Sequence, residues 1–488
     1  MDAAAWRLHP DRVLPAEPGM RALARRILDA TASLPIVSMH GHVDAAVLAD
    51  DAAFTDPATL LVAPDHYIVR MLVSQATAPG PIRDAGVRSA ADLGMGTGPV
   101  ETDPRTIWRR FCAGWPALRG TPSRLWLEHV LVEVFGAPVA PSPATADLLF
   151  DHLSDRLAQP EYRPRALFER FGIELLATTD AATDTLEAHA RLRADGWGDS
   201  VVPTFRPDAL LEAGRSGWRD ELDRLGALTG LDTGSYDGYL DALRARRRAF
   251  IAAGARATDH GHLSPDTTPL AELDARALFA RARQAPLPDA DARAFTAHML
   301  FQMALMSADD GLVMQLHTGV LRDHDRPSAA RHGHDIGFDI PVQTSFTRAL
   351  RPVLEEFGHH PDFHLVVFTV DETAYSRELA PLAGAYPALR LGAPWWFLDA
   401  PEAMARFRAA VTETAGFGNT SGFVDDTRAF CSIPARHDLA RRADASFLAR
   451  LVAEHRLDLD EATDTAVALA YTLARDAYPA PAGTQVTA

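Results

Sequence analysis

Lysine is absent from this sequence of 488 residues, and all 48 basic side chains are arginine. Schiff-base catalysis needs a lysine amine, and a carbamylated lysine that bridges two metal ions needs the same side chain. The missing lysine therefore excludes both of these mechanisms.

Cysteine is scarce, and long apolar runs are missing. Cys112 and Cys431 are the only cysteines, which excludes a disulfide framework and a zinc site made of four cysteines. No run is long enough to span a membrane, and the N-terminus lacks the pattern of a signal peptide. We therefore expect a soluble protein of the cytoplasm.

Positive charge is in deficit, because 65 acidic residues give the chain a formal net charge of −17. An acidic surface disfavours nucleic acids and anionic membranes as partners. A local group of arginines can still bind a small anionic substrate. The partner that we expect is a small molecule.

Eight short apolar runs recur along the chain, and most end in polar residues of the kinds used in catalysis. They are residues Pro35–Met39, Ile173–Ala177, Val201–Phe205, Gly254–Thr258, Leu312–Leu316, Phe363–Val370, Leu389–Pro394 and Gly422–Val424. Strands that alternate with helices predict a parallel sheet, and eight such units predict an α/β fold of the (β/α)8 (TIM) barrel type. A doubly wound open sheet is the alternative, although no glycine-rich phosphate loop follows the first run.

Amphipathic stretches of helical length lie between many of these runs. They are residues Ala182–Ala194, Arg293–Met306, Phe346–Phe357, Pro401–Ala415 and Asp438–His455. Residues 60–165 exceed one strand–helix unit, so we expect a helical insertion after the first strand within a single domain over 1–488. Residues 260–290 are expected to form a long loop with a helical turn, and the tail from Tyr478 is expected to be disordered.

His40-Gly41-His42 follows the first run. Residues i and i+2 of a strand point to the same side, so the two imidazoles are expected to converge at the end of the strand. Imidazole is the commonest metal ligand in proteins and suits zinc and its neighbours. Two ordinary histidines are the alternative, in a chain that has 19 of them.

Asp425-Asp426-Thr427-Arg428 follows the last run. Closure of a barrel would place the eighth strand beside the first, where Asp426 could complete a metal site with the two histidines. Adjacent carboxylates on a strand point in opposite directions, so only one can face the metal. Arg428 should share the side of Asp426, where it could hold a substrate anion or lower the pKa of a neighbour.

Several other side chains are weaker candidates. Asp65 is expected to cap a helix that starts at His66 and Tyr67, and Tyr67 could act as a base only if cations lowered its pKa. Arg206, His317 and Arg322 could clamp an anion, because an arginine fork matches a carboxylate. Trp395-Trp396 is more typical of packing than of sugar stacking.

Taken in order, these segments resemble the uronate isomerase (glucuronate isomerase) family, a branch of the amidohydrolase superfamily. The resemblance is carried by MHGHVD, APDHYIVRML, RRFCAGWP, LLATTDAATDTLEAH, VVPTFRPD, GARATDHG, MQLHTGVLRDHD, GAPWWFLDAP and FVDDTRAFCSIPARHDLARR, from about residue 35 to 445. Ser38-Met39 and Ile433-Pro434-Ala435 depart from the family's pattern and leave the preferred uronate open.

The resemblance implies a distorted barrel with a divalent metal, usually zinc, that interconverts aldo- and keto-hexuronates such as D-glucuronate and D-fructuronate. It implies His40, His42 and Asp426 as the metal site, with Asp426 also assisting catalysis. Further roles implied by the resemblance are proton transfer by Tyr67 and Arg428 with His66 nearby, and substrate binding by Arg206, His317, Arg322 and Trp396.

Two other functions fit the same residues. A relative with the same metal site could hydrolyse or decarboxylate another carboxylated, sugar-like substrate. A barrel without activity could bind sugar acids only. For a large enzyme of this kind we also expect a homo-oligomer.

Overall fold

Short parallel strands form the centre of the molecule, which the computed structural model describes over residues 6–77 and 79–481. A three-stranded sheet has the order β1-β2-β4, a six-stranded sheet has the order β11-β10-β7-β6-β5-β3, and β8 and β9 form an antiparallel pair. The strands are β1 (Ile36–Ser38), β2 (Ile173–Ala177), β3 (Asp180–Ala181), β4 (Val201–Val202), β5 (Phe205–Arg206), β6 (Ala257–His260), β7 (Val313–Leu316), β8 (Val320–Leu321), β9 (Ile340–Pro341), β10 (Leu365–Val367) and β11 (Leu389–Leu391).

The two parallel sheets are linked where the chain passes from β2 to β3 and from β4 to β5. Across this junction the Thr178 amide donates to the Val202 carbonyl at 3.0 Å, and the Asp180 amide donates to the Thr204 carbonyl at 3.0 Å. Neighbouring strands therefore follow the order of the chain from β1 to β11. The predicted parallel α/β fold is confirmed.

The predicted eighth strand is wrong. Gly422–Val424 is not a strand, and the nearest pairing is an isolated parallel bridge between Leu391 and Thr420. Gly422 has φ +72° and lies so close to the backbone of Ala474 that a Cβ would approach its nitrogen to 2.5 Å. This conformation interrupts the extended backbone, and among the described residues the strands do not close into a ring.

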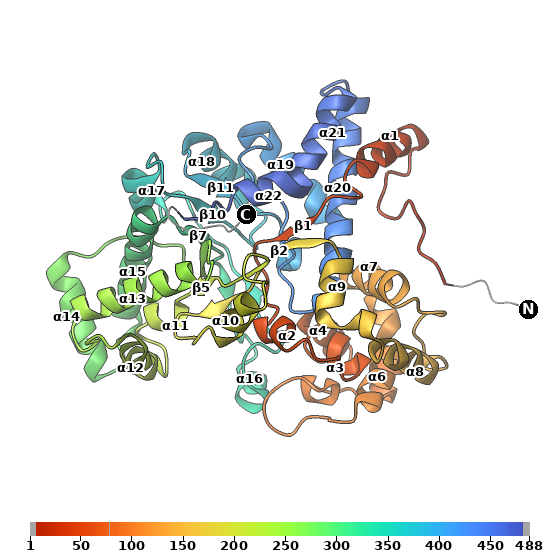
Figure 1. The fold of residues 1–488 in the computed structure, drawn as a ribbon, viewed down its shortest axis with the longest axis horizontal. Helices are drawn as coiled ribbons and strands as arrows, with labels where there is room; N and C mark the ends of the chain where they lie inside the picture. The colour runs from red at the N-terminus through yellow and green to blue at the C-terminus, as the bar shows by residue number, and fades with distance from the viewer. Residues whose placement is uncertain (1–5, 78, 482–488) are drawn as a thin grey trace, which may run out of the picture.

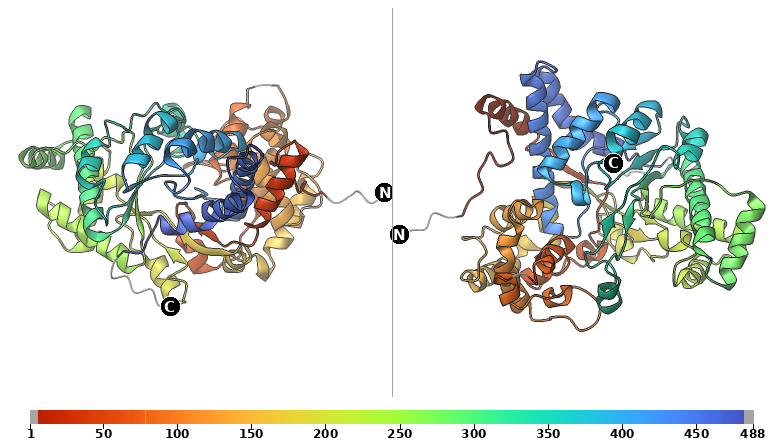
Figure 2. Two further views of the ribbon diagram at one scale, coloured as in Figure 1. Left: turned by 90° about the horizontal axis from the view of Figure 1, so that it is seen from above. Right: turned by 180° about the vertical axis from the view of Figure 1, so that it is seen from behind.

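Helices surround the strands and make up most of the chain between β1 and β2 (Figures 1 and 2). The helices up to β2 are α1 (Pro18–Asp29), α2 (Ala45–Asp50), α3 (Pro57–Leu61), α4 (His66–Ser74), α5 (Pro81–Asp84), α6 (Pro104–Gly114), α7 (Pro122–His129), α8 (Ala146–Leu157) and α9 (Pro164–Arg170). The later helices are α10 (Glu187–Ala194), α11 (Asp208–Leu211), α12 (Trp218–Thr229), α13 (Tyr236–Ala252), α14 (Glu272–Gln284), α15 (Asp289–Asp310), α16 (Arg326–His332), α17 (Arg351–Phe357), α18 (Ala380–Ala385), α19 (Pro401–Ala415), α20 (Ile433–Ala453), α21 (Leu459–Val467) and α22 (Leu473–Asp476). Short 3-10 or π segments are η1 (Ala90–Leu93), η2 (Trp115–Leu118), η3 (Val130–Val134), η4 (Pro160–Tyr162), η5 (Tyr375–Leu379), η6 (Trp396–Leu398), η7 (Phe430–Ser432) and η8 (Ala468–Thr472). In the described part of the chain, no helix combines the length and the apolar character needed to cross a membrane.

Two helical groups flank the strands at opposite ends of the molecule. The group from α3 to α9 packs on β1, β2 and β4 in one hydrophobic core, and the group from α12 to α15 packs in a second core with β7 and β10. Figures 1 and 2 show these groups on opposite sides in every view. The strand ends that carry the candidate site therefore lie between two separately packed helical layers.

Two local predictions are wrong. Residues 260–290, predicted as a long loop with a helical turn, instead contain the 13-residue helix α14, whose Ala275, Phe279 and Ala282 are buried at helical spacing. The tail from Tyr478 begins with an anchored residue, because Tyr478 is fully buried and its hydroxyl donates to Oε1 of Gln315 at 3.0 Å. Residues 482–488 of the predicted disordered tail lie outside the described residues.

This anchor predicts that Tyr478 stabilises the fold. Tyr478→Ala should cost about 3–5 kcal/mol, because it leaves a cavity the size of an aromatic ring. Tyr478→Phe should cost only about 1 kcal/mol, the usual net value of one hydrogen bond. Chemical denaturation of the three proteins measures both losses, and equal stability of Tyr478→Ala and wild type would contradict the packing role.

Candidate active site

His40 and His42 leave the end of β1 and converge on the carboxylate of Asp426. Nε2 of His42 lies 3.1 Å from Oδ1 of Asp426, and Nε2 of His40 lies 3.6 Å from the same oxygen. The Asp426 amide donates to the His40 carbonyl, and the His42 amide donates to the Thr427 carbonyl. These two backbone hydrogen bonds hold together segments that are almost 400 residues apart in the chain.

The conformation of residues 425–428 explains why only one of the two adjacent carboxylates, that of Asp426, faces the histidines. Asp425 points the other way, where its Oδ2 lies 3.2 Å from Nε2 of His437. Asp426 itself has φ +44°, so the segment turns at this residue and the side chain of Arg428 reaches the same pocket. The expected divergence of the two carboxylates is thus observed, although the segment is not a strand.

The imidazole of His40 is held from its other edge by Asp259 at the end of β6. Nδ1 of His40 lies 3.5 Å from Oδ1 of Asp259, and Nε2 of His317 lies 2.9 Å from that oxygen. Neutral imidazole has one lone pair and one N–H. If Nε2 of His40 binds a metal, Nδ1 carries the hydrogen and faces Asp259, an arrangement that orients metal-binding histidines in many proteins.

The protonation states suit metal binding. Burial lowers the pKa of His42 and of His317, and the neighbouring carboxylates of Asp426 and Asp259 oppose this shift. Burial raises the pKa of Asp426, but the hydrogen bond from His42 and nearby cations outweigh it and lower the value overall. Burial likewise opposes ionisation of Asp259, yet His317, His40 and Arg206 hold its pKa well below the usual range.

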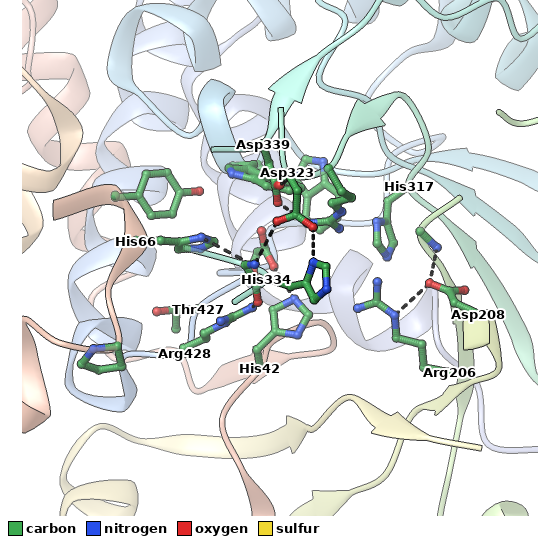
Figure 3. Close-up of a pocket in the computed structure, with 18 of the residues that line it drawn as sticks. His42, His66, Arg206, Asp208, His317, Asp323, His334, Asp339, Thr427 and Arg428 are labelled. Carbon is green, nitrogen blue, oxygen red and sulfur yellow. Dashed lines mark hydrogen bonds and ion pairs between the residues drawn. The ribbon is translucent and has the colours of Figure 1, made fainter. Parts of the chain in front are cut away.

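These residues lie at one side of a pocket of about 860 Å³. Figure 3 shows His42, Arg206 and His317 directed into the same space, with His66 and Arg428 across from Arg206. All eight predicted catalytic and substrate-binding residues line this pocket: His66, Tyr67, Arg206, His317, Arg322, Trp396, Asp426 and Arg428. His40 does not line it, because its side chain is fully buried behind Asp426.

Each of the three arginines predicted to belong to the site forms an ion pair with an aspartate. Nε of Arg206 donates to Oδ2 of Asp208 at 3.0 Å, and NH1 of Arg322 donates to Oδ2 of Asp339 at 2.7 Å. Arg428 makes a close ion pair with Asp335. A guanidinium has five N–H donors, so each arginine keeps donors for a ligand after this pairing.

Tyr67 and His66 are positioned by the start of α4. The side chain of Asp65 caps this helix by accepting from the amides of Tyr67 and Ile68, as predicted. Burial raises the pKa of Tyr67 well above its ordinary value, and Asp399 adds to this effect while Arg436 opposes it. The condition for Tyr67 to act as a phenolate base is therefore not met, and its buried hydroxyl has no hydrogen-bond partner among the described residues.

Two tryptophans close the pocket on one side. The ring of Trp395 packs edge-on against His40 and His317, with centroids 4.9 and 4.8 Å away. Trp396, with φ +52°, lies under the guanidinium of Arg322 at 4.7 Å. Trp395 thus supports the histidines and Trp396 supports an arginine.

Besides Asp208 and Asp339, which hold arginines, four further residues of the site were not assigned roles from the sequence. Asp259 joins His40 to His317, Asp335 holds Arg428, and Arg436 makes a buried ion pair with Asp399 at 2.8 Å. Asp259 follows a predicted strand and so could have been found. The other three come from loops or helices with no distinctive pattern.

The ligand set fits a divalent metal. Both ring nitrogens of His40 are buried without a hydrogen-bond partner, although burial without a partner is costly for such atoms. His40, His42 and Asp426 offer one ligand atom each within 4.8 Å of one another. Two imidazoles and a carboxylate are typical of a catalytic zinc site with an open position.

Comparisons with known proteins place the chain in a family. A family model described as glucuronate isomerase matches residues 20–477. The uronate isomerase of Rhizorhabdus wittichii is 55% identical over 478 residues, covering 98% of this chain and 100% of the relative. The relative from Phenylobacterium zucineum is 53% identical, covering 97% and 96%.

Among solved structures, glucuronate isomerase from Caulobacter crescentus superimposes with a TM-score of 0.92 at 47% identity and covers 97% of each chain. Uronate isomerase from Thermotoga maritima gives a TM-score of 0.88 at 26% identity, covering 97% of this chain and 100% of that chain. The matches extend over nearly the whole sequence, and the chain belongs to the uronate isomerase (glucuronate isomerase) family.

Proposed function

We propose that this protein interconverts aldo- and keto-hexuronates of the D-glucuronate and D-fructuronate type, through an enediol. The observation that carries the proposal is the meeting of His40, His42 and Asp426 at the wall of a pocket that also holds fixed arginines. A hexuronate has one carboxylate and several hydroxyls. Arginine donors and ionised aspartates in one pocket match both kinds of group.

His40, His42 and Asp426 would hold the metal, for which we propose zinc. When bound, a divalent metal acts as a Lewis acid on the sugar's carbonyl and the neighbouring hydroxyl. Asp259 supports this by fixing the ring of His40. Asp426, kept ionised in the pocket, is also placed to help open the cyclic sugar.

Isomerisation requires removal of the C2 proton and delivery of a proton at C1. We assign the imidazole of His66, whose pKa is lowered by burial, as the acceptor of the C2 proton, and Tyr67, whose pKa is raised, as the proton donor at C1. The two rings lie side by side, and transfer of a proton from His66 to Tyr67 restores both groups. Arg428, anchored by Asp335, would stabilise negative charge that develops on the enediol oxygens. His66 lies beside both, with its Nδ1 3.8 Å from Oδ1 of Asp335.

Arg206, His317 and Arg322 would bind the substrate, with Trp396 as the pocket wall. Arg206 and Arg322 come from different strand ends and both face the pocket. Because protein carboxylates already fix them, less side-chain entropy is lost on binding. We assign the substrate carboxylate to this pair.

We also propose that the strands form a distorted barrel in one domain that contains residues 60–165 as a helical insertion. The support is that the β1 end and residues 426–427 are joined by two backbone hydrogen bonds where an eighth strand would pair. A cytoplasmic location and a homo-oligomeric state stay predictions from the sequence. Sedimentation analysis of the purified protein tests the second.

The proposed reaction is tested by incubating the purified protein with D-glucuronate and D-galacturonate, each with added zinc or manganese. We expect the corresponding ketose, detected by chromatography or NMR. Protein treated with a chelator is the control. Absence of ketose with every metal would contradict the proposal, and release of a different product would favour a hydrolase or a decarboxylase.

The metal role predicts that His42→Ala lowers both metal content and activity, because it removes one of three ligands. Elemental analysis and the isomerase assay measure the two quantities on the same sample. His359→Ala is the control, since His359 is exposed and outside the pocket. Full activity of His42→Ala with no bound metal would remove the metal from the mechanism.

The role of Tyr67 predicts that Tyr67→Phe lowers kcat by about 10²–10⁴-fold, the usual contribution of a positioned acid or base, with little change in KM. Because burial keeps the phenol protonated, the wild-type rate should show no ionisation of Tyr67 near neutral pH. Tyr239→Phe is the matched control, as Tyr239 is buried and bonded to the Leu210 carbonyl. An unchanged kcat in Tyr67→Phe would exclude the assignment.

A further inference from the structure

A second His-Gly-His sequence, His260-Gly261-His262, ends β6. Its two imidazoles lie beside the carboxylate of Asp208, the first residue of α11. The three side chains offer one ligand atom each within 4.8 Å of one another. They share no residue with the set of His40, His42 and Asp426.

Each of the three side chains has one buried polar atom that lacks a hydrogen-bond partner and is free to bind a ligand. Nδ1 of His260, Nε2 of His262 and Oδ1 of Asp208 are all buried, and none has a hydrogen-bond partner. His260 is 0% exposed, His262 is 2% exposed and Asp208 is 9% exposed. Nε2 of His262 lies 3.4 Å from Oδ1 of Asp208, so three unsatisfied polar atoms border one small space.

The opposite atom of each side chain is held in place. Nε2 of His260 lies 3.0 Å from Oγ1 of Thr258, and Nδ1 of His262 lies 3.0 Å from Oε1 of Glu212. Glu212 can only accept, because a carboxylate has no hydrogen to donate, so Nδ1 of His262 carries the hydrogen. In the neutral ring, which is the form that binds a metal, the lone pair of His262 is then on Nε2, the nitrogen that lies 3.4 Å from Asp208.

Asp208 is fixed in the same way. Its Oδ2 accepts from Nε of Arg206 at 3.0 Å and from the Gly261 amide at 3.1 Å, which leaves Oδ1 for the shared space. Gly261 allows this approach, because a Cβ there would lie 2.6 Å from NH2 of Arg206 and from Cε1 of His317. Outer partners that orient each ligand and leave one atom free are typical of metal sites.

We propose that Asp208, His260 and His262 bind a second divalent transition-metal ion. Two imidazoles with one carboxylate favour zinc, cobalt or nickel over magnesium or calcium, which prefer oxygen ligands. The ion reaches the site from the substrate pocket, whose wall includes Asp208, Glu212 and Gly261 but neither histidine. Figure 3 shows Asp208 beside Arg206, to which it is hydrogen-bonded.

The ion has a positioning role. It binds one oxygen of Asp208 while Arg206 binds the other, so it fixes the carboxylate that orients a pocket arginine. The ligands come from β6 and from the start of α11, and the ion therefore also ties these two elements together.

The test measures zinc binding to the full chain in a His40→Ala/His42→Ala background, where the first site is disabled. Titration calorimetry after removal of metal should give one equivalent of zinc. Adding His262→Gln should weaken zinc binding at least 100-fold, and adding Glu212→Ala should weaken it about 10–100-fold, the usual effect of losing an outer partner. Cobalt absorption spectra of the same proteins should lose the bands of the bound ion in parallel.

His298→Gln in the same background is the matched control, because His298 is a buried histidine bonded to Tyr236 outside this group. It should bind zinc as the background protein does. Glu212→Ala keeps the test valid if His262→Gln does not fold, since the side chain of Glu212 is 35% exposed. No zinc binding in the background protein, or binding that both variants leave unchanged, would overturn the second site without bearing on the isomerase activity.

Discussion

The candidate site depends on the joining of the β1 end to residues 426–427. The two backbone hydrogen bonds between these segments place the Asp426 carboxylate against the rings of His40 and His42. The ring nitrogens of His40 are buried without a hydrogen-bond partner, and a bound metal would remove the free-energy cost of such unsatisfied polar atoms. Gly41 permits the approach, since a Cβ there would only touch Asp425 and the Thr427 carbonyl at 3.5 Å.

The arginines of the pocket are already paired with protein carboxylates. Arg206, Arg322 and Arg428 each contact an aspartate, so net charge alone would not attract an anion to the pocket. If these arginines bind the substrate as we propose, its selection would depend on the direction of their remaining N–H groups, which a planar guanidinium fixes and an ammonium does not. A chain without lysine builds its whole cationic surface from such directional groups.

The sequence predicts well the strands, helices and helix caps that local sequence patterns determine. The first seven strands, helix α19 and the cap at Asp65 follow from apolar runs, helical periodicity and an N-cap residue. The pairing of His40 with His42 follows from their place after a predicted strand. Asp426 was expected at the end of an eighth strand that is absent, and two backbone hydrogen bonds bring it to the histidines instead.

Prediction failed where distant contacts decide the structure. Tyr478 lies in a Pro- and Ala-rich tail, and only its contact with Gln315 on β7 shows why it is ordered. Gly422 leaves the extended conformation because Ala474 packs against it. The ion pair of Arg436 with Asp399 joins α20 to the loop after η6, and no periodicity in either segment indicates it.

The His-Gly-His spacing brings two imidazoles together but does not determine what they bind. The chain has three copies, at residues 40–42, 260–262 and 332–334. The third ends α16 and, within residues 6–77 and 79–481, joins no group of metal-ligand side chains.

The other two copies differ in two ways: in the part of the chain that supplies the carboxylate, and in how far the histidines are exposed. For the first copy the carboxylate comes from the far end of the chain, and His42, 24% exposed, faces the pocket. A metal there has an open side for substrate, as catalytic sites require. For the second copy the carboxylate comes from the neighbouring strand–helix unit, and both rings are buried. That enclosure leaves no room for a substrate beside the proposed ion, so the same motif would serve the proposed chemistry at β1 and rigidity at β6.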